Sequence, residues 1–122
     1  MKIIDANYIL RYLLKDIDEQ YLKSASVIEN YNVFLPGEII AEVVYVLQKV
    51  YQVPDEIIKS TLLDLFEYPT ISINEPKIIK KALSIFAGNR VDYADALLIA
   101  FVKEKNATIF TFDKKVNRII NQ

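Results

Sequence analysis

The sequence predicts a doubly wound α/β fold, in which helices cover both faces of a parallel sheet. Short apolar runs alternate along the chain with longer stretches in which apolar residues recur at helical spacing. The short runs are almost continuously apolar, which is typical of strands that are buried on both faces. With 122 residues, of which 52% are hydrophobic, the chain has the size of one globular domain, so we expect a single domain over residues 1–122.

The first half of the chain begins with a strand and a helix. "KIID" is a short apolar run that ends at Asp5, and "ANYILRYLLKD" then places four aliphatic residues at helical spacing. A second helix is expected from about Asp18, followed by the buried strand "NVFLP" and the long helix "GEIIAEVVYVLQKVY". Pro54 opens the next helix, "PDEIIKSTLLDLFEY", because proline is tolerated in a first helical turn.

The second half continues the same alternation. "TISIN" reads as a third strand, "EPKIIKKALSIFAG" as a helix that ends at Gly88, and "DYADALLIAFVKEKN" as another helix. "ATIFTF", residues 107–112, is expected to form a fourth strand, and "DKKVNRIINQ" a closing helix. No repeat and no linker interrupts this order.

Two residue types are absent, and their absence limits the chemistry. The chain has no histidine and no cysteine, which excludes histidine acid–base catalysis, catalytic triads, disulfides and nearly all zinc sites. If the protein is an enzyme, we expect carboxylates to be its reactive groups, and carboxylates suit hard cations such as Mg²⁺ or Mn²⁺. The net charge of −1 means that nucleic acid would have to bind a local patch. The apolar runs are too short to span a membrane, so we expect no membrane association and a cytoplasmic location.

Four acidic residues occupy positions that favour one shared site. Asp5 and Asp113 follow the first and fourth expected strands, and ligands of such sheets bind at the carboxyl ends of the strands. Glu42 interrupts the apolar run "IIAEVVYVL", and Asp95 interrupts "YADALLIAFV". Burying an unpaired carboxylate is strongly unfavourable, so a shared cluster is the simplest explanation of all four.

Each of these acids also has a structural interpretation. Asp5 and Asp113 directly precede helices and could serve only as N-caps, and Asp92 fits a cap better than a site residue. Glu38 lies in a first helical turn, where the helix dipole favours an acid. For Glu42 and Asp95 the alternative is a buried ion pair, and the candidate arginines are Arg11, Arg90 and Arg118.

Three segments resemble the PIN domain, and within that family the VapC-type toxin ribonucleases of toxin–antitoxin pairs. They are "IIDANYILRYLLKD", "EIIAEVVYVLQKVYQV" and "VDYADALLIAFVKEKNATIFTFDKK", in that order. The resemblance implies a three-layer α/β/α fold with a short parallel sheet of four strands, or of five as in many members. It assigns the family's acidic quartet to Asp5, Glu42, Asp95 and Asp113, with supporting roles for Asn7 and Thr111.

The implied activity is cleavage of RNA phosphodiester bonds with Mg²⁺ or Mn²⁺ as cofactor. Asp5 and Asp95 would be the principal metal ligands, Asp113 would complete the site, and Glu42 would be a ligand or would orient water. Asp92 lies three residues before Asp95 and could touch the site. Four basic residues near the acids could contact phosphates, although exposed basic residues are most often only solvated. They are Arg90, Lys114, Lys115 and Arg118.

The expected partners are the RNA substrate, a cognate antitoxin and, in a homodimer, a second copy of the chain. Tyrosines in the first two helices fit an aromatic groove for an antitoxin segment or, more simply, the core. A response-regulator receiver and a haloacid-dehalogenase-type phosphatase are disfavoured, because "TISIN" offers only Asn74 and position 7 is Asn7. The remaining alternative is a PIN-like module with an idle site that only binds a partner.

Overall fold

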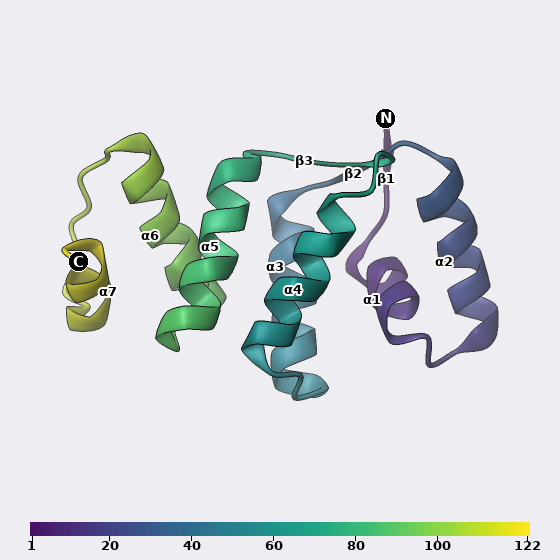
Figure 1. The fold of residues 1–122 in the computed structure, drawn as a ribbon, viewed down its shortest axis with the longest axis horizontal. Coiled ribbons are helices and arrows are strands. Elements are labelled where there is room, and N and C mark those ends of the chain that lie inside the picture. Colours follow the sequence, from purple (N-terminus) through teal and green to yellow (C-terminus); the bar gives the residue numbers. More distant parts are fainter. The chain divides into compact units, whose positions relative to one another are not determined.

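The computed structural model describes residues 1–122 and divides them into two compact units, Met1–Asn74 and Glu75–Gln122. Figure 1 draws the first unit in purple to teal and the second in green to yellow. Buried apolar residues occur in both units. None of the helices has the length and apolar character that crossing a membrane requires.

The first unit contains a parallel sheet, as the sequence predicts. Its strands are β1 (Lys2–Ile3), β2 (Val33–Leu35) and β3 (Ile71–Ile73). They lie in the order β1-β2-β3, with β2 parallel to both neighbours. The prediction of a parallel sheet flanked by helices is therefore confirmed. The helices of this unit are α1 (Ala6–Leu14), α2 (Asp18–Asn30), α3 (Gly37–Tyr45), η1 (Val46–Val50) and α4 (Asp55–Phe66).

Apolar stripes at helical spacing hold the first unit together. On α3 and η1 the buried residues recur every three or four positions, as expected for one helix face. Helix α1 packs against both α2 and α3, and α4 packs against β3. The largest fully buried side chains of this unit are Ile9, Ile28, Val33, Leu35, Ile40, Val43, Ile58 and Leu62.

The long helix expected over residues 37–51 changes its winding near its end. From Val46 to Val50 it is a π-helix, and the N–H of Tyr51 donates to the carbonyl of Val46 at 3.1 Å, an i→i+5 bond. Gln52, with φ 53°, then ends it in the left-handed region. The wider turn places the hydroxyl of Tyr51 within 3.1 Å of Nη2 of Arg11 on α1.

The second unit is built from helices alone. They are α5 (Pro76–Asn89), α6 (Tyr93–Lys105) and α7 (Lys114–Ile120). Helix α6 packs against both of the others, and the rings of Phe86 and Tyr93 meet edge-on with centroids 6.0 Å apart.

Two sequence predictions for this unit are wrong. Residues 107–112 form no strand, so the sheet has three strands and neither four nor five. A strand needs a neighbouring strand to satisfy its backbone groups, and the second unit contains none. Phe110 and Phe112 are fully exposed there. Gly88 also does not end its helix, because α5 continues to Asn89 and Arg90 takes the left-handed position at φ 53°.

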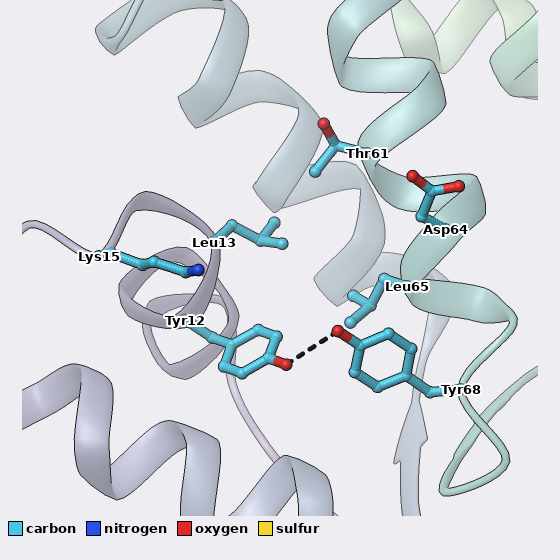
Figure 2. Close-up of a pocket in the computed structure, with 7 residues that line it drawn as sticks. All are labelled: Tyr12, Leu13, Lys15, Thr61, Asp64, Leu65 and Tyr68. Carbon is cyan, nitrogen blue, oxygen red and sulfur yellow. Dashed lines mark hydrogen bonds between the residues drawn. The ribbon is translucent and has the colours of Figure 1, made fainter.

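Hydrogen bonds join the side chains of Tyr12 on α1, Glu29 on α2 and Tyr68 after α4, and Figure 2 shows the bond between the two tyrosines. The hydroxyl of Tyr12 donates to Oε2 of Glu29 at 3.1 Å, and the hydroxyls of Tyr12 and Tyr68 lie 2.9 Å apart. Since the one proton of the Tyr12 hydroxyl points to Glu29, Tyr68 must donate to Tyr12. Burial raises the pKa of Tyr12 well above its usual value, and the bonds to Tyr68 and Glu29 raise it further.

Beside this chain lies a cavity of about 250 Å³. Figure 2 shows that α1 supplies one wall of it and α4 the other. Its lining residues are Tyr12, Leu13, Lys15, Thr61, Asp64, Leu65 and Tyr68.

The variant Tyr12→Phe should lower the free energy of unfolding at pH 7 by about 1 kcal/mol, because two hydroxyl bonds lose a partner. Above about pH 10 the unfolded chain loses the Tyr12 proton before the folded chain does. The unfolded state then binds fewer protons than the folded state, so the stability of the wild type falls as the pH rises. Tyr12→Phe has no hydroxyl at this position and lacks this pH-dependent loss.

The difference in the free energy of unfolding between the wild type and Tyr12→Phe should therefore shrink between pH 7 and about pH 11. Urea unfolding at both pH values measures it. Tyr45→Phe is the matched control, because Tyr45 is 61% exposed. A difference that stays constant with pH would contradict the raised pKa of Tyr12.

Candidate functional site

The four acids that the sequence singles out are divided between the two units. Asp5 and Glu42 belong to the first unit, and Asp95 and Asp113 belong to the second. Neither unit by itself groups three acidic residues closely enough to hold a metal ion.

Asp5 stands between β1 and α1. It is the N-cap of α1, and its Oδ1 accepts a hydrogen bond of 3.0 Å from the backbone N–H of Tyr8. The capping interpretation is thus confirmed, but it uses only one of the two carboxylate oxygens. Asp5 is exposed and helps to line a cavity of about 690 Å³. The other lining residues are Met1, Lys2, Ile3, Ile4, Tyr8, Val27 and Ile39.

Glu42 lies on α3 but is exposed, so the expectation that it is buried is wrong. The run "IIAEVVYVL" is apolar on every side of the helix, whereas only one face of α3 packs into the core. Ile39, one turn before Glu42, lines the cavity that contains Asp5. Because residues three apart are neighbours on a helix, Glu42 lies one turn along α3 from that cavity.

Asp95 is half-buried in the first turn of α6. No ion pair joins Asp95 or Glu42 to a basic residue of its own unit; Arg11, one candidate partner, pairs with Asp16 at 3.2 Å. Asp92 occupies the N-cap position of α6, as predicted, but its side chain makes no capping bond. The two carboxylates, three residues apart, share one face of the helix start.

Asp113 is the N-cap of α7, and its Oδ1 accepts from the N–H of Val116 at 2.9 Å. Its own N–H donates to Oγ1 of Thr111 at 3.1 Å. The carbonyl of Thr111 also accepts from the side-chain amide of Asn117 at 3.1 Å. Thr111 therefore helps to shape the turn before α7, and its supporting role in a site stays a prediction.

A single bond ties the start of α7 to the loop before α6. Nζ of Lys115 donates to the carbonyl of Arg90 at 2.6 Å. Lys115 follows Asp113 by two positions, and Arg90 precedes Asp92 by two. The bond thus brings the helix starts that carry Asp92, Asp95 and Asp113 to the same end of the second unit.

The residues expected to contact RNA differ in their exposure and in their hydrogen bonds. Arg90, Lys114 and Arg118 are exposed, whereas Lys115 is half-buried and already donates to a backbone carbonyl. Their contact with phosphate stays a prediction. Asn7 is exposed in the first turn of α1, two positions after Asp5.

The donors available at these positions suit a hard divalent cation. All are carboxylate oxygens, and the two capping acids, Asp5 and Asp113, each keep one oxygen that makes no capping bond. The chain's own chemistry thus fits Mg²⁺ or Mn²⁺ better than Zn²⁺.

Tyr8 is a residue of this region that the sequence analysis did not assign to the site. Tyr8 lines the Asp5 cavity, and its N–H is the group that Asp5 caps. Its position in the first turn of an amphipathic helix, on the side away from the apolar stripe, was the available signal. Among the other helix tyrosines, Tyr12 is buried as the core interpretation requires, whereas Tyr31 is 48% exposed.

A comparison with protein families finds a match over nearly the whole chain. The PIN domain matches residues 2–121, which includes both units and all four acids. No curated protein matches the chain at a level that indicates relatedness.

The capping role of Asp113 can be separated from any role of its charge. Asp113→Ala should destabilise α7 by about 1 kcal/mol, whereas Asp113→Asn should cost only a few tenths, because asparagine and aspartate are equally good N-caps. Urea unfolding followed by NMR signals of residues 114–120 measures both, with Asp5→Ala and Asp5→Asn as the corresponding pair on α1. If the alanine variant is as stable as the asparagine variant, the bond to Val116 contributes nothing.

Proposed function

Because the chain belongs to the PIN domain family, whose members are generally nucleases, we propose that it is an endoribonuclease that uses Mg²⁺ or Mn²⁺ to cleave RNA phosphodiester bonds. The observation that carries this proposal is the quartet Asp5, Glu42, Asp95 and Asp113. None of the four has an ion-pair partner within its own unit. The family match spans all of them, and PIN nucleases generally use divalent metal ions.

The proposal assigns the metal to carboxylates from both halves of the chain. Asp5 and Asp95 would be the principal ligands, Asp113 would complete the set, and Glu42 would bind as well or orient the attacking water. When bound, such an ion activates water and stabilises the charge that develops as a phosphodiester is displaced in line. Products with a 5′-phosphate and a 3′-hydroxyl are expected.

The protein's own contribution is to hold these acids in place. The helix caps fix the rotamers of Asp5 and Asp113, because each carboxylate is bonded to a backbone N–H three residues on. The free carboxylate oxygens are then preorganised, and little conformational entropy is lost when they bind a cation. Exposed Arg90, Lys114 and Arg118 would contact phosphates and position the RNA without reading its sequence.

We further propose that the nuclease acts in the cytoplasm as the toxin of a toxin–antitoxin pair, with a cognate antitoxin as its protein partner. This part rests on the resemblance of the three motifs to VapC-type toxins. Whether the chain acts as a monomer or as a homodimer would follow from the mass of the purified protein. If the purified chain binds RNA or a protein but cleaves nothing with Mg²⁺, the idle PIN-like module is the better description.

The purified chain should cleave labelled RNA with Mg²⁺ or Mn²⁺ and should stop when a chelator is added. Asp95→Asn should lower the cleavage rate by roughly a hundredfold or more, because losing a ligand removes several kcal/mol of transition-state stabilisation. Asp18→Asn is the matched control, since Asp18 is an exposed acid in the first turn of α2. In the host, expression of the wild type should arrest growth and expression of Asp95→Asn should not.

Purifying Asp95→Asn in parallel excludes a contaminating nuclease. If the wild type then still cleaves RNA in excess chelator, the metal mechanism is wrong. Equal loss of activity in Asp18→Asn and Asp95→Asn would show that both changes act through folding and not through the site.

A further inference from the structure

Lys115 connects two parts of the second unit through one hydrogen bond. Its Nζ donates to the carbonyl of Arg90 at 2.6 Å, although 25 positions separate the two residues. A bond from a charged ammonium is shorter and stronger than a bond between neutral groups. Lys115 is half-buried, whereas Lys114, its neighbour on the same helix, is exposed. The two adjacent lysines are therefore a matched pair, of which one carries this contact.

The bond also supports the end of α5. Arg90 is the C-cap of that helix and lies in the left-handed region, with φ 53°. A residue other than glycine is strained there and depends on its surroundings to hold it. The last carbonyls of a helix have no partner within the helix, and the helix dipole favours a cation near them. The ammonium of Lys115, which comes from α7, therefore holds the Arg90 peptide in place.

Each end of this bond is two residues from an acid. Arg90 precedes Asp92, the N-cap of α6, by two positions, and Lys115 follows Asp113, the N-cap of α7, by two. Asp95 lies in the first turn of α6. One end of the bond thus fixes the chain directly before α6, and the other end belongs to the turn that Asp113 caps. Loss of the bond would let the two helix starts shift relative to each other.

Few other contacts fix the start of α7. The helix has seven residues, and its buried residues are Val116 and Ile119. Residues 107–112, which precede it, form no strand, so no sheet holds this part of the chain. A segment with few buried apolar contacts has low local stability. We therefore expect the position of Asp113 to depend on the Lys115 bond.

The ammonium of Lys115 is not used to neutralise the acids. It forms no ion pair with Asp92, Asp95 or Asp113. An ammonium paired with one of these carboxylates would compete with a metal cation, but an ammonium bound to a backbone carbonyl leaves the carboxylate oxygens free. Charge and geometry thus make opposite predictions. Removing a nearby positive charge would by itself strengthen cation binding, whereas losing the bond would weaken it.

We propose that Lys115 is a positioning residue of the nuclease. It touches neither the metal nor the RNA, and it holds the start of α7 against the chain before α6 so that Asp113 and Asp95 can bind the same cation. The inference rests on the proposed function, and it gives Lys115 a role other than the phosphate contact expected from the sequence. Loss of a residue that orients metal ligands typically weakens metal binding by about ten- to a hundredfold.

The test measures Mn²⁺ binding to the full chain by isothermal titration calorimetry in the absence of RNA. Lys115→Met removes the ammonium and keeps a long aliphatic side chain with good helix propensity, and the Kd for Mn²⁺ should rise roughly tenfold. Lys114→Met is the matched control, because it removes the same charge from the neighbouring exposed position. Its Kd for Mn²⁺ should stay the same or fall slightly, since the only change is the loss of a screened positive charge.

Two further variants separate positioning from folding. Lys115→Arg keeps a charged donor and should restore most of the Mn²⁺ affinity that Lys115→Met loses. Lys115→Gln keeps an N–H donor without the charge, and it takes the place of Lys115→Met in every comparison if the methionine variant does not fold. Urea unfolding shows which variants fold. Amide NMR signals of residues 91–95 should shift in Lys115→Met and not in Lys114→Met.

The cleavage assay gives a second measure of the same effect. Lys115→Met should need roughly tenfold more Mn²⁺ to reach half of its maximal rate. At saturating Mn²⁺ its rate should be close to that of the wild type, because the variant loses metal affinity and keeps every proposed ligand.

The outcomes separate this inference from the proposed function. Mn²⁺ affinity in Lys115→Met that equals or exceeds that of the wild type would overturn the positioning role, even if the wild type cleaves RNA with Mg²⁺. Equal losses of affinity in Lys114→Met and Lys115→Met would overturn it too, as would a wild type that does not bind Mn²⁺. If neither Lys115→Met nor Lys115→Gln folds, the lysine is structural and the inference is wrong. If Lys115→Met weakens Mn²⁺ binding while the wild type cleaves no RNA with any divalent ion, the positioning role holds and the nuclease proposal fails.

Discussion

The hydrogen bond from the N–H of Tyr8 to Asp5 sets the point at which the first strand becomes the first helix, and much of the first unit is arranged around that point. The cap gives α1 a defined start directly after β1, so the buried face of α1 meets α2 on one side and α3 on the other. Residues of α1 and α2 together line a cavity of about 230 Å³. One local bond thus links the sheet edge, the helix packing and the place of the first candidate ligand.

A helix of the second unit also begins with an aspartate N-cap. Asp113 caps α7 as Asp5 caps α1, and both acids use Oδ1 for the cap. A cap satisfies one of the orphan N–H groups at a helix start, and the helix dipole favours the negative charge there. The cap uses Oδ1 of each carboxylate, so Oδ2 stays available for the metal that we propose.

Local patterns in the sequence predicted the helices and strands well wherever a residue's environment depends on its near neighbours. The capping positions of Asp5 and Asp113 could be read from the sequence because a cap needs only the next three residues. Glu42 could not be placed in the same way. Its helix is apolar all round, so periodicity does not show which face is buried, and the structure leaves Glu42 and the nearby Tyr45 exposed. The missing capping bond of Asp92 likewise depends on a side-chain rotamer that no pattern reports.

The sequence by itself determined the class of the protein and the chemistry open to it. Apolar runs and helical spacing predicted a parallel sheet with flanking helices, and the absence of histidine and cysteine favoured carboxylates as the candidate reactive groups. Only the tertiary structure decided that residues 107–112 form no strand, that Tyr12 bonds to Glu29 and Tyr68, and that Nε of Arg11 is buried without a partner. The reason is physical: helix capping and periodicity are set within a few residues, whereas strand pairing, burial and side-chain hydrogen bonding need partners that are distant in the chain.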